Sequence, residues 1–111
     1  MLIVFAGLPG TGKTTIAREL ARQIGATYLR IDSMEQALRG SGVCRDSLDD
    51  AGYRVAYEVA LDNLRVGRTI IADSVNPIPL TRDAWHAVAD QAQVPVVDLS
   101  LIHISEPTRP Y

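Results

Sequence analysis

The stretch GLPGTGKT, residues 7–14, matches the phosphate-binding loop pattern G-x-x-x-x-G-K-S/T without a gap. Lys13 is the only lysine of the chain, and the other ten basic residues are arginines. A lysine carries a compact ammonium on a flexible stem, which can reach the β- and γ-phosphates of a nucleotide. The pattern therefore predicts a nucleotide-binding loop in which Lys13 contacts the phosphates.

The residues on either side of this loop provide the context that the motif requires. Residues 2–6 are wholly apolar, as is typical of a strand buried on both faces. After the loop, apolar residues recur at helical spacing from Ile16 to Ile24, and Gly25 is suited to end a helix. The glycines let the chain lie close to phosphate oxygens, and the first amides of the helix point at the anion. The predicted nucleotide-binding residues are Gly7, Gly10, Thr11, Gly12, Lys13, Thr14 and Thr15.

Strand-like and helix-like segments alternate through the rest of the chain. Residues 27–31 form a second apolar run that ends at Asp32. Ser33 and Gln36 have the spacing of a capping box, so we expect a helix from there to about Arg39. Residues 40–49 have the composition of a loop.

Two further helices and two further strands are expected beyond this loop. A helix from Asp50 to Gly67 would bury a face made of Tyr53, Tyr57, Ala60, Leu61 and Leu64. Residues 69–72 read as a third strand ending at Asp73, and residues 74–79 as a loop. The last helix would turn Ala84, Trp85, Val88, Ala89 and Ala92 inward, ahead of a strand from Val94. This alternation predicts an α/β fold with a parallel sheet and with ligands at the carboxyl ends of its strands.

Two aspartates at predicted strand ends are candidate site residues. Asp73 is placed to hold magnesium through water beside the hydroxyl of Thr14, or it is an N-cap or turn aspartate ahead of Pro77. Asp32 is placed to accept a proton from a substrate hydroxyl, or it caps the helix that begins near Ser33.

Composition excludes several classes of protein. With 111 residues, 47% of them hydrophobic and 22% charged, the chain is one soluble globular domain at most. A net charge of −2 gives no electrostatic footprint for nucleic acid. The first apolar run lacks a basic flank, so we expect neither a signal peptide nor a membrane span. We therefore expect the protein to be cytoplasmic. Cys44 is the only cysteine, which excludes a disulfide within the chain and a cysteine-based zinc site.

The phosphate loop, the segment LRID at 29–32 and the segment IIADSVN at 70–76 together resemble one family. They are similar to the small P-loop kinases related to zeta toxins, polynucleotide 5′-kinases, gluconate kinases and adenylylsulfate kinases, over about residues 1–98. This resemblance implies a three-layer P-loop NTPase fold with a parallel sheet of order 2-3-1-4. It also implies ATP-dependent phosphoryl transfer to the hydroxyl of a small molecule or nucleotide, with ATP and Mg²⁺ as cofactors.

The resemblance further implies roles for particular residues. Asp32 matches the base that receives the hydroxyl proton, while Asp73 and Asn76 match a segment that lines the acceptor and magnesium side. Arg30 and Arg82 would contact an anionic acceptor or the transferred phosphoryl group, or they are solvated surface arginines. A P-loop ATPase or nucleotide-dependent switch without a small-molecule acceptor is the alternative function, and an inactive fragment is a further one.

The last residues resemble something other than a protein family. Residues 99–109, LSLIHISEPTR, match the translation of a transposon-end adapter used in sequencing libraries. We therefore expect residues 1–98 to be the N-terminal part of a P-loop kinase domain, and residues 99–111 to be a non-native tail. The lid and last strand of the resembling kinases would then be missing. The alternative is a native strand with a proline-rich end, and in either case residues 96–104 are apolar enough to complete the fourth strand.

Overall fold

The fold is built on one parallel sheet. The computed structural model describes residues 1–7, 12–42, 51–74 and 79–100. Its strands are β1 (Leu2–Ala6), β2 (Thr27–Arg30), β3 (Ile70–Ser74) and β4 (Val96–Ser100). All pairings are parallel and the order is β2-β3-β1-β4, which confirms the predicted fold class and strand order.

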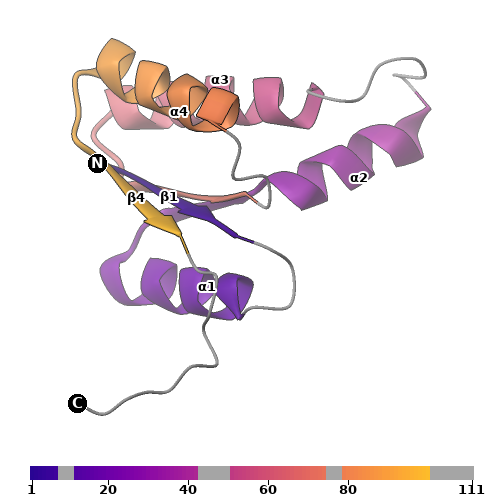
Figure 1. Ribbon diagram of the computed structural model, residues 1–111, viewed down its shortest axis with the longest axis horizontal. Coiled ribbons are helices and arrows are strands. Elements are labelled where there is room, and N and C mark those ends of the chain that lie inside the picture. Colours follow the sequence, from indigo (N-terminus) through magenta and orange to yellow (C-terminus); the bar gives the residue numbers. More distant parts are fainter. Residues whose placement is uncertain (8–11, 43–50, 75–78, 101–111) are drawn as a thin grey trace.

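Helices cover both faces of this sheet. They are α1 (Lys13–Ile24), α2 (Ile31–Ser41), α3 (Ala51–Arg65) and α4 (Pro79–Ala92). Figure 1 shows α1 on one face, α3 and α4 on the other, and α2 projecting beyond the sheet. The chain thus forms three layers, as predicted. None of the helices in these described stretches is long and apolar enough to cross a membrane.

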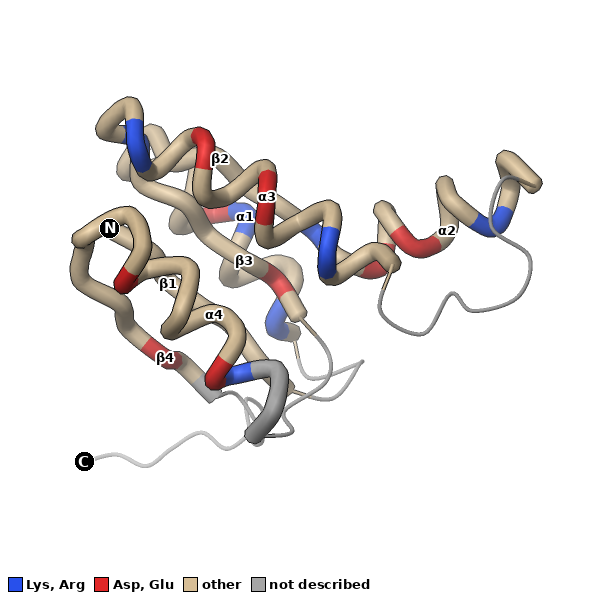
Figure 2. Tube along the Cα trace, turned by 90° about the horizontal axis from the view of Figure 1, so that it is seen from above, with Lys and Arg blue, Asp and Glu red and all other residues tan. Residues whose placement is uncertain are grey.

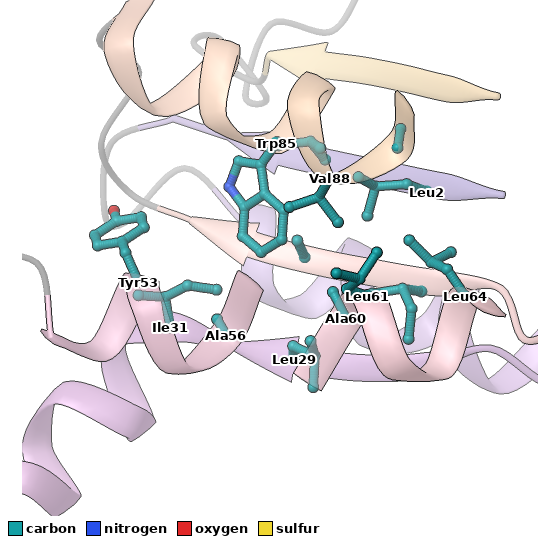
Figure 3. Packing of buried hydrophobic residues seen from close by; sticks show 14 residues of the cluster. Leu2, Leu29, Ile31, Tyr53, Ala56, Ala60, Leu61, Leu64, Trp85 and Val88 are labelled. Atoms are coloured by element: carbon teal, nitrogen blue, oxygen red, sulfur yellow. The ribbon is translucent and has the colours of Figure 1, made fainter. Parts of the chain in front are cut away.

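Alternation along the strands divides the core between the two faces. The larger cluster lies between the sheet and α3 and α4, and it holds the predicted inward faces of both helices except Ala84 (Figure 3). The smaller one joins Ile3, Phe5 and Ile71 to Ala17 and Ala21 of α1. Because successive side chains of a strand point to opposite faces, Asp73 lies on the α1 face with Ile71, and the next residue lies on the α3 and α4 face.

The helix after the phosphate loop ends where the sequence indicates. Gly12 precedes α1 with a φ of 85°, and Gly25 follows it with a φ of 69°. Both values lie in the left-handed region that glycine adopts without a steric penalty. Ala17 and Ala21 are buried against the sheet, while Ile16 and Ile24 are 40% and 49% exposed. The contact stripe of α1 is therefore narrower than the run of apolar residues suggests.

The start of α2 corrects one prediction. The second strand ends at Arg30 and the helix begins at Ile31, so Ser33 lies inside the first turn and is not the N-cap. Ile31 is 2% exposed and belongs to the large core cluster, so tertiary packing decides where the helix starts. The helix also continues past Arg39 to Ser41, and Gly42 ends it with a φ of 72°.

Three other boundaries also differ from the sequence prediction. β3 includes Asp73 and Ser74, because pairing with β1 continues to its last residue. Helix α4 begins at Pro79, which was predicted as loop, and proline is well suited to a first helical position. The fourth strand begins at Val96, two residues later than predicted. Cys44 and residues 101–111 lie outside the described residues.

The close packing of α2 against α3 depends on Gly52. A Cβ at this position would overlap Cγ of Glu35 and lie 3.2 Å from the backbone nitrogen of Glu35. We expect Gly52→Ala to lower the free energy of unfolding by about 1–2 kcal/mol, measured by urea titration. Gly40→Ala is the control, since a Cβ there meets nothing within 4 Å and alanine favours the helix by about 0.5–1 kcal/mol. Equal stabilities of the two variants would contradict this account.

Candidate functional site

The candidate site is organised around the carboxylate of Asp73. Lys13 Nζ forms an ion pair with Asp73 Oδ1, and Thr14 Oγ1 donates a hydrogen bond of 3.0 Å to Asp73 Oδ2. The side chains of Lys13 and Asp73 are only 4% and 1% exposed. Figure 2 shows the start of α1 close to the carboxyl end of β3. The fold thus brings together two of the predicted phosphate-loop residues and the predicted strand-end aspartate.

The position of Asp73 follows from the sheet topology. β3 lies between β1 and β2, and Asp73 is in register with Phe5 on one side and Arg30 on the other. Since α1 starts directly after the loop that leaves β1, its first residues lie over the carboxyl end of the neighbouring strand. The site is therefore a product of the strand order as well as of the loop motif.

Tyr28 is a third partner of this carboxylate, and sequence reasoning missed it. Its hydroxyl donates a hydrogen bond of 2.5 Å to Asp73 Oδ2. Burial raises the pKa of Tyr28 from 10.0 to about 12, assisted by the hydrogen bond to Asp73 and by its negative charge, while Arg18 acts in the opposite direction. Only the pairing of Tyr28 with Ile71, two residues before Asp73 on β3, places the phenol here.

This contact predicts a pH dependence of stability. Because the folded state raises the pKa of Tyr28, the neutral phenol stabilises the fold fully below about pH 10, and that contribution is lost as the pH rises to about 12. We expect the free energy of unfolding to fall by about 1 kcal/mol more in the native chain than in Tyr28→Phe over this window, since partial exposure weakens the effect. Urea titrations at about pH 8 and about pH 11 measure it. Parallel losses in both proteins would contradict the assignment.

Asp32 lies in a separate cluster at the start of α2. Its Oδ2 is 3.5 Å from Arg30 NH2 and accepts a hydrogen bond of 3.2 Å from Gln36 Nε2. Arg30 also donates to Ser33 Oγ at 3.1 Å. The N-cap of α2 is Arg30 and it has no side-chain cap hydrogen bond, so Asp32 does not cap this helix, although a carboxylate in the first turn interacts favourably with the helix dipole. The described contacts of Asp32 are thus within its own segment, and its role as a base stays a prediction.

The remaining predicted residues are placed as follows. Gly7 is buried at the end of β1, Gly12 precedes α1, and Thr15 and Arg82 are exposed. Gly10, Thr11 and Asn76 lie outside the described residues. Within the described ranges, no group of three or more histidine, cysteine, aspartate and glutamate side chains could hold a metal ion. A single carboxylate beside a hydroxyl still fits Mg²⁺, which usually keeps several waters and takes only one or two carboxylates.

The fold and the site together define the class of this protein. The parallel sheet has the order 2-3-1-4, and its first strand is followed by a glycine-rich loop and a helix. The first residue of this helix, Lys13, contacts a carboxylate at the end of a neighbouring strand. These features together define a P-loop NTPase fold. A family model described as an AAA domain matches residues 2–108. The chain belongs to this family.

Individual relatives are similar over different lengths. Lon protease 1 of Sorangium cellulosum is 38% identical over 60 residues, which are 54% of this chain and 6% of that protein. The 26S proteasome regulatory subunit 4 homolog of Saccharomyces cerevisiae is 38% identical over 66 residues, 56% of this chain and 15% of that protein. The chain therefore spans only a small part of these curated relatives.

Several solved structures share this fold, among them two that are named as kinases. The APS kinase of Mycobacterium tuberculosis superposes with a TM-score of 0.74 at 19% identity, covering 98% of this chain and 80% of that one. A gluconokinase from Sinorhizobium meliloti superposes with a TM-score of 0.60 at 16% identity, covering 88% of this chain and 55% of that one. At these identities the likeness shows the fold, which is the small P-loop kinase fold that the sequence resembles.

Proposed function

We propose that this chain carries the nucleotide site of an ATP-dependent phosphotransferase that acts on a hydroxyl of a small molecule or nucleotide. The observation that carries the proposal is the convergence of Lys13 and Thr14 on Asp73. A buried ammonium, a hydroxyl and a carboxylate at the carboxyl end of a central strand match the needs of a magnesium-bound triphosphate. The kinase folds that superpose on the chain support the proposal.

Each of these residues has a part in nucleotide binding. Lys13 and the amides of the loop, with Gly7, Gly10, Thr11, Gly12 and Thr15, would hold the β- and γ-phosphates. Thr14 and Asp73 would hold Mg²⁺, which when bound neutralises charge on the phosphates. Before the nucleotide binds, Asp73 is the partner of Lys13, so the phosphates would take over a cation that the fold already holds in place.

The acceptor side is proposed to involve the predicted residues at the neighbouring strand ends. Asp32 would orient the acceptor hydroxyl and take its proton. Arg30, Asn76 and Arg82 would contact an anionic part of the acceptor or the transferred group. Most of the rate would come from positioning and charge stabilisation. A cytoplasmic location, where ATP is abundant, would suit this activity.

The boundaries of the catalytic unit are also a proposal. We propose that residues 1–98 are the N-terminal part of the kinase domain and that residues 99–111 are an adapter-derived tail. Leu99 and Ser100 pair with β1 through their backbones. Backbone pairing does not depend on side-chain identity, so it is compatible with both a native and an adapter-derived tail. Sequencing the native gene past the codon for Asp98 tests this, since a natural reading frame that continues into residues 99–111 would overturn it.

Acceptor-dependent turnover tests the proposed activity. The full-length protein encoded by the native gene, which would include the lid and the last strand, is incubated with MgATP and a panel of sugars, sugar acids and nucleosides, and both ADP and phosphorylated product are measured. We expect ADP to form in proportion to product with at least one class of hydroxyl acceptor. Binding of MgATP without acceptor-dependent ADP across the panel would contradict the kinase assignment.

A second candidate function is a P-loop ATPase that drives a protein partner. The similarity to Lon protease 1 and to a proteasome regulatory subunit favours it. In this case phosphate would be released without any acceptor, and a protein partner would accelerate the release. Malachite-green measurement of phosphate, with and without the acceptor panel, separates the two candidates.

A further inference from the structure

The carboxyl end of β3 presents polar groups on both faces of the sheet. Asp73 lies on the α1 face with Lys13 and Thr14. Ser74, the next residue, lies on the opposite face, where its Oγ is 3.0 Å from the hydroxyl of Tyr53 in α3. Both Ser74 and Tyr53 are buried. A hydroxyl pair thus lies one residue along the chain from the carboxylate of Asp73, on the side of the sheet opposite to Lys13 and Thr14.

Trp85 adds an unmatched donor on this second face. Its side chain has no exposed surface, and its Nε1 has no hydrogen-bond partner among the described residues. The indole packs edge-on against Tyr57, with ring centroids 4.7 Å apart and planes at 84°. In Figure 3 its nitrogen lies at the end of the cluster where the Tyr53 hydroxyl also lies. An unmatched buried N–H costs about 1–3 kcal/mol, and most buried tryptophans find a partner.

We propose that Trp85 Nε1–H, on the same face of the sheet as the Tyr53–Ser74 hydroxyl pair, recognises the acceptor by donating a hydrogen bond to one of its oxygens. The inference rests on the proposed function. Phosphates held by Lys13 would lie on the α1 face, and an acceptor must reach them from another side. The indole and the two hydroxyls lie on the other side of β3.

The chemistry of these groups selects the kind of oxygen. All three are neutral, and burying a charged group beside them without a counter-charge would be costly. The oxygen that Trp85 contacts is therefore uncharged, and a second hydroxyl of the acceptor, besides the one that is phosphorylated, would supply it. A free sugar and the ribose of a nucleoside both meet this requirement. Because Nε1 is fully covered in this structure, the acceptor must displace the atoms that cover it.

The indole N–H can be observed directly, because Trp85 is the only tryptophan of the chain. In ¹⁵N-labelled protein it gives a single indole cross-peak. With MgADP bound, we titrate D-glucose and, separately, adenosine. We expect the peak to shift in a saturable way with one of them and its hydrogen exchange to change, which identifies the source of the hydroxyl. No response to either probe, or a full response to MgADP alone, would overturn the proposal.

A variant without the N–H tests the same point in kinetics. Replacing Trp85 by benzothienylalanine keeps the shape of the ring system and puts sulfur in place of the N–H. We expect KM for the acceptor to rise about three- to tenfold while KM for ATP stays unchanged and the melting temperature rises, because the unmatched buried N–H is gone. Fluorotryptophan, which keeps the N–H, is the matched control and should leave all three unchanged. An unchanged KM for the acceptor would overturn the role of Trp85.

The two readouts keep this inference separable from the proposed function. If no acceptor is phosphorylated but the indole peak shifts saturably with a sugar or nucleoside, the kinase assignment fails and the hydroxyl contact stands. If phosphorylation occurs but neither the indole peak nor KM for the acceptor responds, the kinase assignment stands and the role of Trp85 is wrong.

Discussion

Lys13→Ala abolishes the binding of MgATP, with an expected loss of affinity of at least about a hundredfold. Lys13 is the only lysine of the chain, its side chain is 4% exposed beside Asp73, and we propose that its ammonium contacts the phosphates of the nucleotide. Lys13→Arg should bind almost as poorly, since a planar guanidinium on a longer side chain does not fit a site shaped for a compact ammonium. Isothermal titration calorimetry with MgATP measures both variants.

The control for this experiment lies on the same helix. Arg22 is exposed and forms its ion pair with Glu19 at 3.3 Å, so Arg22→Ala should bind MgATP as the native chain does. Lys13→Ala also leaves the buried carboxylate of Asp73 without its cation, which lowers stability. In the double variant with Asp73→Asn, stability should recover while MgATP binding stays lost. Recovery of binding along with stability would contradict a direct contact between Lys13 and the phosphates.

The sequence predicts the parts of this fold that are encoded locally. The loop pattern, the apolar run before it and the helical spacing after it lie within residues 2–25, so each can be recognised from neighbouring residues. Asp73 could be proposed as a site residue because it follows a buried strand, and its contacts with Lys13 and Thr14 agree with that placement. The strand order came from the resemblance to a family.

The contacts that the sequence did not predict are those between distant segments. Tyr28 reaches Asp73 because β2 pairs with β3, and Tyr53 reaches Ser74 because α3 packs over the end of β3. Neither residue belongs to a local motif. The start of α2 was misplaced for the same reason, since the burial of Ile31 in the core outweighs the capping-box pattern at Ser33. A local motif therefore shows where the site lies. The pairing and packing of distant segments decide which other polar side chains take part in it.

Asp32→Asn leaves the affinity for MgATP unchanged and lowers the rate of phosphoryl transfer by about a hundred- to ten-thousandfold. Asparagine has the shape of aspartate and can still accept the hydrogen bond from Gln36, so the start of α2 should keep its structure. The ion pair with Arg30 is lost, but both side chains are partly exposed and stability should change by less than about 1 kcal/mol.

Single-turnover measurement of product at saturating MgATP gives the rate of Asp32→Asn, with the exposed Asp62→Asn on α3 as control. A slow Asp32→Asn with native affinity for MgATP separates the base from the nucleotide site, because only an interaction made during transfer is then missing. An unchanged rate would leave Asp32 with its contacts to Arg30 and Gln36 alone, as a carboxylate that stabilises the first turn of α2. The acceptor proton would then have to leave through another group, and the kinase proposal would rest on Lys13, Thr14 and Asp73.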